Sequence, residues 1–155
     1  MYDTAGELVG ILRATPEVLR ALLREVTPER ARAARGGDDG WSVIEVLCHL
    51  RDAEVRALER MRAMRDEANP VIRGYDQEAW ARERDYAGDN MDRALDAFVS
   101  LRAQHVADLE ALGPDEWERP GRHSEAGAVT ILSHTIHIAH HDAVHAAQIA
   151  RQLAS

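Results

Sequence analysis

Four stretches of the chain carry apolar residues at spacings of three and four, which is the period of one face of an α-helix. The stretches cover residues 8–26, 42–67, 91–112 and 130–153. A composition that is 45% hydrophobic but only 5% aromatic also favours helices over sheets, and 155 residues suit one domain with one core. We therefore predict an all-α four-helix bundle that forms a single domain over residues 1–155.

Sequence signals near the ends of these stretches predict the helix boundaries. Ser42 followed by Glu45 is a capping-box pattern, so the second helix should begin at Ser42. Thr130 is a suitable N-cap for the fourth helix. Pro16 lies inside the first stretch after Thr15, and we expect either a kink there or a restart of the helix with Thr15 as its N-cap.

The connections between the helices predict their directions. The first connection has a turn at Thr27-Pro28 and a glycine-rich loop at residues 36–40, and its shortness favours antiparallel first and second helices. Residues 68–90 form a long connection that permits a crossover, with a short helix at 77–82, so the second and third helices should be parallel. If the third and fourth helices form a hairpin, the second and fourth are antiparallel.

Histidines are concentrated near the end of the chain. Six of the eight histidines follow residue 122, and five of these lie in the fourth helix. At ~100° per residue, four of the five share an arc of about 80° with a glutamine, while His140 points elsewhere. This polar stripe consists of His134, His137, His141, His145 and Gln148. Imidazoles on an inward face need hydrogen-bond partners or a metal ion, and a metal ion explains the whole stripe.

Spacing alone leaves several chelating pairs open. His141 and His145 stand at i and i+4, which lets two imidazoles bind one ion from the same helical face. His137 with His141 has the same separation, and His134 with His137 would also chelate. The choice between these pairs depends on what faces them from another helix.

An antiparallel second helix brings one further histidine to this region. His49 lies seven residues after Ser42, and His145 lies eight before Leu153, so the two come level, whereas His137 is about two turns too far away. Three ligands leave one or more coordination positions open, as catalytic metal sites require. The predicted ligands of a divalent transition metal are His49, His141 and His145.

Residues near the predicted ligands give weaker signals. Three polar side chains within one turn of a ligand could hold its second ring nitrogen: Glu45, Asp52 and Gln148. For Asp52, solvated surface is an equal alternative. His134 and His137 are expected in structural positions or around the ligands. Cys48 points about 100° away from His49 and is expected in the core.

Aromatic residues of the long connection have two interpretations. They could form the wall of a pocket near the metal, or they could pack the connection onto the bundle: Tyr75, Trp80 and Tyr86. His105 and Trp117 give no signal beyond packing.

Charge and cysteine content exclude several functions. The net charge of −8 comes from 27 acidic and 19 basic residues, so the surface should repel nucleic acid. The single cysteine excludes an internal disulfide, and no secretion signal precedes the first helix, so we expect a cytoplasmic protein. No apolar run approaches the ~20 residues that cross a bilayer, and we expect no membrane association.

Two motifs carry a family resemblance. The segment from Trp41 through His49 to Glu54, and the segment from His141 through His145 to Ile149, resemble the DinB-like superfamily, including its YfiT-type metal-dependent hydrolases. The resemblance extends over nearly the whole chain. It implies a four-helix bundle with a long crossover between the second and third helices, and usually a homodimer. It also implies that the metal ligands are His49, His141 and His145.

The resemblance also implies a class of chemistry. Members of this group include bacillithiol S-transferases and mycothiol-dependent maleylpyruvate isomerases, in which a low-molecular-weight thiol is activated beside the metal. We expect an enzyme in which zinc or nickel activates either such a thiol, for example bacillithiol, or water for attack on a small-molecule substrate, with Gln148 or a nearby carboxylate orienting the water. The alternative is a non-catalytic, dimeric metal-binding or stress-related protein. His134, His137 and His140 go beyond the family pattern and leave a second or shifted site open.

Overall fold

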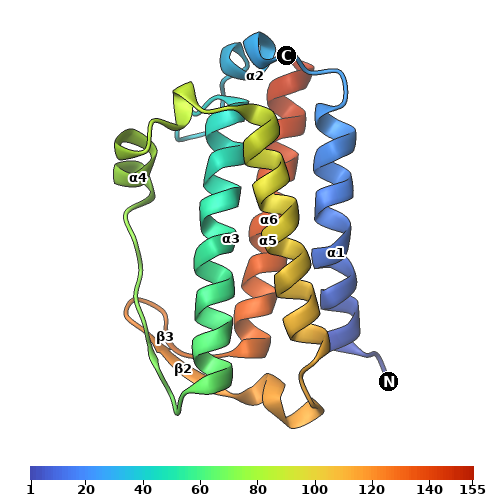
Figure 1. Cartoon of the computed structure of the whole chain (residues 1–155), viewed down its shortest axis with the longest axis vertical. Helices are drawn as coiled ribbons and strands as arrows, with labels where there is room; N and C mark the ends of the chain where they lie inside the picture. Colours follow the sequence, from blue (N-terminus) through green and yellow to red (C-terminus); the bar gives the residue numbers. More distant parts are fainter.

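The computed structural model describes residues 1–155, and its four long helices form a bundle (Figure 1). The helices are α1 (Thr4–Leu23), α3 (Val43–Asp66), α5 (Met91–Glu110) and α6 (Ile131–Ala154). α1 and α6 run in one direction and α3 and α5 in the other, so α3 and α6 are antiparallel (Figure 1). The predicted bundle, its crossover and its helix directions are therefore confirmed. None of the helices has both the length and the apolar composition that a membrane span requires.

Side-chain caps begin α3 and α6 where the sequence indicated. Ser42 Oγ accepts a hydrogen bond from the Glu45 amide at 3.3 Å, and Glu45 Oε1 accepts one from the Ser42 amide at 3.2 Å. Thr130 Oγ1 accepts a hydrogen bond from the Ser133 amide at 3.1 Å. These bonds satisfy amides that have no partner in the first turn of a helix.

The expected restart at Thr15-Pro16 is wrong, because α1 continues through this position. Pro16 cannot donate the helical hydrogen bond to the carbonyl of Leu12. That carbonyl instead accepts a hydrogen bond from Nη1 of Arg102 on α5, at 3.0 Å. The Thr15 hydroxyl does not cap a helix but donates to Asp142 on α6, at 2.7 Å. Partners on other helices thus allow α1 to remain unbroken.

Short elements occur that the sequence did not indicate. The turn expected at Thr27-Pro28 is the start of a one-turn helix, α2 (Pro28–Ala33), with Thr27 as N-cap. Three short strands form a sheet in the order β1-β2-β3, in which β1 pairs parallel with β2 and β2 antiparallel with β3. They are β1 (Val71–Ile72), β2 (Pro120–His123) and β3 (Gly127–Thr130). Strands of two to four residues are too short to show an alternating pattern.

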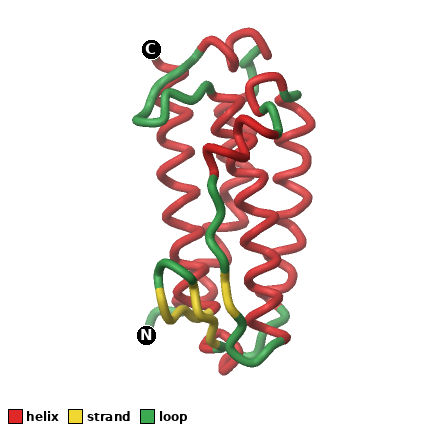
Figure 2. Tube along the Cα trace, turned by 90° about the vertical axis from the view of Figure 1, so that its left-hand side faces the viewer, coloured by secondary structure: helices red, strands yellow, loops and turns green.

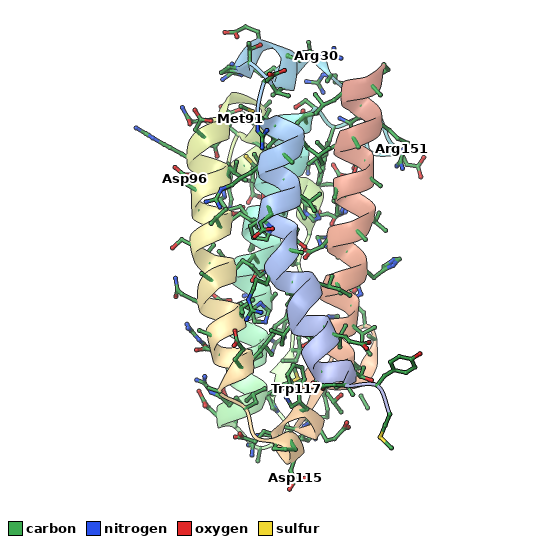
Figure 3. The ribbon with its side chains drawn as sticks, turned by 90° about the vertical axis from the view of Figure 1, so that its right-hand side faces the viewer. Arg30, Met91, Asp96, Asp115, Trp117 and Arg151 are labelled. Carbon is green, nitrogen blue, oxygen red and sulfur yellow. The ribbon has the colours of Figure 1, made fainter.

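The crossover runs along the outside of the bundle (Figure 2). β1 attaches its first part to the β2–β3 hairpin, and its later part contains α4 (Gln77–Glu83), as predicted, and the 3₁₀ turn η1 (Tyr86–Gly88). A second 3₁₀ turn, η2 (Pro114–Glu118), closes the end of the bundle opposite α2 and buries Trp117 (Figure 3).

A buried polar layer divides the core into two apolar clusters. One cluster contains residues such as Leu19, Leu47 and Phe98, and the other contains residues such as Leu12, Met61 and Leu109. Each long helix contributes one or two buried polar residues, which lie in sequence between the residues that belong to one cluster and those that belong to the other. The residues of this layer are Thr15, Glu54, Arg102, His105 and Asp142.

Arg102 is the centre of this layer and is only 1% exposed. Its two Nη atoms donate to both carboxylate oxygens of Asp142, at 2.6 and 3.0 Å, and Nη2 also donates to Glu54 at 2.8 Å. Nδ1 of His105 donates to the other oxygen of Glu54 at 2.7 Å. Burial alone would raise the pKa of Glu54, but His105 and Arg102 hold it below its usual value. The interpretation of His105 as simple packing was therefore wrong.

Candidate metal centre

Three histidines from two helices meet near the α2 end of the bundle. His49 lies in the second turn of α3, and His141 and His145 lie one turn apart on α6. Each offers a ring nitrogen, and these nitrogens all lie within 4.8 Å of one another. Nε2 of His49 and Nε2 of His141 are 2.9 Å apart. The structure thus brings the three predicted residues together, at the register that antiparallel helices require.

The environment of the cluster keeps the imidazoles of His49 and His141 neutral. His49 is 2% exposed, while His141 and His145 are partly open to solvent. Burial, followed by the nearby His145, lowers the pKa of His49 to about 4. Burial and the two neighbouring histidines lower the pKa of His141 to about 2. At neutral pH these rings therefore have lone pairs that can bind a cation.

This donor set fits a divalent transition metal. Nitrogen ligands lie about 2.0–2.1 Å from zinc, which puts them roughly 3.4 Å apart in a tetrahedral site. The ring nitrogens here lie within 4.8 Å of one another, and two of them are 2.9 Å apart, which brackets this separation. Imidazole is a common ligand for zinc, nickel and copper, whereas calcium and magnesium prefer oxygen.

A relay of polar groups orients one of these histidines. Nδ1 of His145 donates to Oε1 of Gln148 at 2.9 Å, and Nε2 of Gln148 donates to Oδ1 of Asp39 at 3.3 Å. With its Nδ1 held, His145 presents Nε2 to the cluster. The predicted contact of Gln148 with a second ring nitrogen is confirmed. Asp39 was missed because it lies in a loop, where helical spacing gives no signal.

The other two candidates for such a contact do not reach the cluster. Glu45 accepts from Ser42 in the helix cap and lies 3.1 Å from Arg35. Asp52 accepts from the Tyr86 hydroxyl at 2.5 Å and from two arginines at 2.9 and 3.0 Å. It is 5% exposed, so both interpretations of Asp52, as a partner of a ligand and as solvated surface, are wrong.

The remaining histidines and Cys48 lie outside the cluster. His137 and His140 are exposed, and the ring of His137 lies 6.3 Å from that of His141. His134 is buried, and neither of its ring nitrogens has a partner. Cys48 is a core residue, as predicted, and burial raises the pKa of its thiol to about 12.

The aromatic residues of the crossover pack against other side chains of the crossover and against α3. The ring centroids of Tyr75 and Trp80 lie 4.5 Å apart, and the guanidinium carbon of Arg84 lies 3.6 Å from the ring centroid of Trp80. Tyr86 is 1% exposed. A cavity of about 390 Å³ adjoins Tyr75, but its lining contains none of the three clustered histidines and neither Trp80 nor Tyr86, so the structure supports the packing interpretation of this segment and not a pocket near the metal. A larger cavity of about 610 Å³ lies beside Val9 and Trp117, at the end of the bundle away from the histidine cluster. It has no histidine in its lining.

Desolvation of His134 makes the stability of the metal-free protein dependent on pH. Burial, followed by His105 and Arg60, lowers the pKa of His134 from 6.5 to about 3. Below pH 6.5 the unfolded chain therefore binds a proton that the folded chain does not, and the free energy of unfolding falls with pH until about pH 3. Relative to neutral pH, the loss in the free energy of unfolding should reach about 1.4 kcal/mol at pH 5.5. The substitution His134→Leu removes the titrating group and therefore this loss.

Urea denaturation of metal-free protein at pH 7.5 and 5.5 tests this expectation. The His134→Leu variant should gain about 1.4 kcal/mol relative to wild type between the two pH values. His140→Leu, which alters an exposed histidine of the same helix, is the control. The same pH response in wild type and His134→Leu would contradict the expectation.

Comparisons with known proteins agree with this architecture. The family model of the DinB superfamily matches residues 11–149. YfiT of Bacillus subtilis is 25% identical over 149 residues, which cover 94% of this chain and 83% of that protein. OB0782 of Oceanobacillus iheyensis is 29% identical over 127 residues, which cover 81% of this chain and 72% of that protein. Both carry the provisional name of metal-dependent hydrolase.

A solved structure extends this similarity to the fold. The structure of Bacillus subtilis YfiT, described as having "an unusual four-helix bundle topology", superposes with a TM-score of 0.84 at 22% sequence identity. The superposition covers 99% of this chain and 90% of that one.

Proposed function

Because the chain belongs to the DinB superfamily, we propose that it is a metal-dependent hydrolase whose metal ion is bound by His49, His141 and His145. The observation that carries this proposal is the convergence of three imidazoles, one buried and two partly open to solvent, at one point. The provisional names of the relatives support the class of reaction. Zinc and nickel are the metals that this donor set suits best.

In this proposal the metal ion and the residues around it have different roles. The metal ion supplies Lewis-acid chemistry that lowers the pKa of a water or a thiol and so makes a nucleophile available at neutral pH. His49 is held by its burial in α3, against the ring of Trp41 at a centroid distance of 5.2 Å. Gln148 and Asp39 hold His145. We assign Gln148 this positioning role rather than direct contact with the substrate, because both ends of its amide are engaged.

Gln148→Leu tests this role of the relay. Without the acceptor for Nδ1, the ring of His145 loses its fixed orientation, and metal affinity should fall roughly 10–100-fold. Competition with a chromogenic chelator measures the change. Gln104→Leu on the exposed face of α5 is the matched control and should keep the affinity of wild type. Equal affinities of Gln148→Leu and wild type would contradict the assignment.

A thiol S-transferase is the second candidate, and the surrounding carboxylates favour it. Glu45 and Asp52 are both committed to other partners, so neither is free to take a proton from water. A small-molecule thiol has a pKa much closer to neutrality than water, so with a bound metal it would release its proton to solvent and would depend less on such a base. The thiol would have to come from a small molecule such as bacillithiol, because Cys48 is buried and protonated at neutral pH.

Parallel assays distinguish these reactions. Metal-loaded and metal-free protein are incubated with a carboxylic ester, an amide and a phosphoester, and separately with monochlorobimane plus cysteine, glutathione or bacillithiol. Metal-dependent cleavage without thiol supports the hydrolase, and metal-dependent conjugation supports the transferase. If neither reaction occurs and chelation lowers the melting temperature strongly, the non-catalytic metal-binding alternative is favoured.

We also propose that the chain forms a homodimer through the exposed sides of α1 and α6. Four aliphatic side chains of these two helices are 45–48% exposed: Ile11, Val18, Ile136 and Val144. Ile11 and Ile136 lie at similar heights in these parallel helices, as do Val18 and Val144. Light scattering after size exclusion should give twice the chain mass of 17.3 kDa. A single chain mass at micromolar concentration would contradict the dimer.

A further inference from the structure

Two arginines of α3 lie on the same helical stripe as His49. Arg56 and Arg60 follow His49 by seven and eleven residues, which places each within about 20° of its direction. Along the helix axis they lie roughly 10 and 16 Å beyond it. Helical side chains lean toward the N-terminus, so both arginines lean toward the histidine cluster.

Arg60 has no carboxylate partner. It is half-buried, its Nη2 donates to the carbonyl of Arg73 at 2.6 Å, and its Cζ lies 6.0 Å from the ring centroid of Tyr75. No carboxylate lies within ion-pair distance, and its buried Nε has no hydrogen-bond partner. Arg56 binds Glu59 through Nη1 at 2.8 Å, but its buried Nε is likewise unpartnered. Nη1 of Arg60 and Nη2 of Arg56 also make no hydrogen bond and, unlike the two Nε atoms, are not buried, so these two donors remain available to a ligand.

The surroundings of Arg60 concentrate positive charge. Burial, followed by Arg56, lowers the pKa of Arg60. Arg60 also contributes to the lowered pKa values of His134 and His137, behind burial and neighbouring histidines, so its charge acts on the histidine stripe of α6.

The acidic groups near these arginines pair with only one of them. Asp52 is committed to Tyr86 and two arginines, Glu59 binds only Arg56, and Glu125 lies beyond ion-pair distance of Arg60. In a chain with a net charge of −8, Arg60 therefore lacks a counter-ion that the protein could easily have supplied, and Arg56 has one only at Nη1.

We propose that Arg56 and Arg60 bind an oxyanion group, a carboxylate or a phosphate, of the substrate that reacts at the histidine cluster. Guanidinium groups match the geometry of both oxyanions, and partial burial strengthens the bond. The inference rests on the proposed function and narrows its substrates to small anionic molecules. The anionic group lies two to three helical turns from the reacting bond, within the α3–α6 side of the bundle that the crossover flanks (Figure 2).

Calorimetric titration of metal-free protein, dialysed free of chelator, tests this subsite directly. The probes are inorganic phosphate, succinate and the neutral analogue succinamide. We expect saturable, salt-sensitive binding of at least one anion and none of succinamide. Arg60→Gln and Arg56→Gln should each weaken binding roughly ten-fold or more, the usual effect of losing a hydrogen bond to a charged group. Phosphate and succinate separate the two oxyanion classes.

Control variants make the result specific. Arg93→Gln removes the same charge from the exposed face of α5 and should leave affinity within about two-fold of wild type. His141→Ala should bind the anion like wild type, because the subsite lies outside the cluster. Circular dichroism confirms that each variant is folded. No saturable binding, or an equal loss in Arg93→Gln, would overturn the inference. Metal content of the same variants, measured before the metal is removed for the titrations, reports separately on the proposed function.

Discussion

Arg102→Met is expected to lower the free energy of unfolding by about 3–5 kcal/mol, the largest effect on stability of any change considered for this protein. Arg102 is 1% exposed and is the common partner of Glu54 and Asp142. Methionine fills much of the space but leaves both carboxylates buried without a countercharge. It also removes the donor for the Leu12 carbonyl that Pro16 leaves without a helical partner. Four helices lose a shared contact.

The pH dependence of this loss identifies its electrostatic origin. In wild type the pKa of Glu54 lies below its usual value of 4.5, so its contribution to stability is present above pH 4.5 and is lost as pH falls further. In Arg102→Met only His105 still opposes the effect of burial, so Glu54 takes up a proton at higher pH than in wild type. The difference between variant and wild type should therefore shrink from pH 7 to pH 4.

Urea denaturation at both pH values measures this difference. Arg93→Met, at an exposed position of the same helix, should change the free energy of unfolding by less than about 0.5 kcal/mol. A loss below about 1 kcal/mol in Arg102→Met, or one that does not depend on pH, would show that the buried layer is not held together by charge.

His141→Ala is expected to reduce the metal content from about one ion per chain to near zero after dialysis. The substitution leaves two ligands from different helices, and of these only His145 has a hydrogen bond to its second ring nitrogen. Affinity should fall by more than the roughly 10–100-fold that the loss of a ligand's hydrogen-bond partner costs. Without metal, the variant should be at least as stable as wild type, because the crowding of neutral imidazoles in the cluster is relieved.

His140→Ala is the matched control for this experiment. It removes the adjacent histidine on the same helix, which is exposed and outside the cluster. Elemental analysis of protein prepared without a histidine tag should find wild-type metal content in this variant. Metal content unchanged in His141→Ala, or lost equally in both variants, would refute the ligand set. Added zinc should raise the melting temperature of wild type and His140→Ala but not of His141→Ala.

Local signals in the sequence were enough to determine the helices and their starts. The period of the apolar residues indicated α1, α3, α5 and α6, and the capping pattern at Ser42 and Glu45 placed the start of α3 at the correct residue. The length of the 68–90 connection then predicted the crossover and the antiparallel pairing of α3 with α6. That pairing alone was sufficient to choose His141 and His145 over other pairs and to place them beside His49.

Only the tertiary structure decided which polar residues are buried together. The partners of Arg102 come from α1, α3 and α6, and no spacing within one helix relates them. Contacts from α5 and α6 also keep α1 continuous at Pro16, against the local tendency of proline to break a helix. Asp39 reaches Gln148 from a loop. Arg60 is assigned to anion binding because no carboxylate lies within ion-pair distance of it, and only the tertiary structure shows this. The period of the apolar residues indicates which side chains of a helix face the core. The partner of a buried charged side chain depends instead on how several helices pack together.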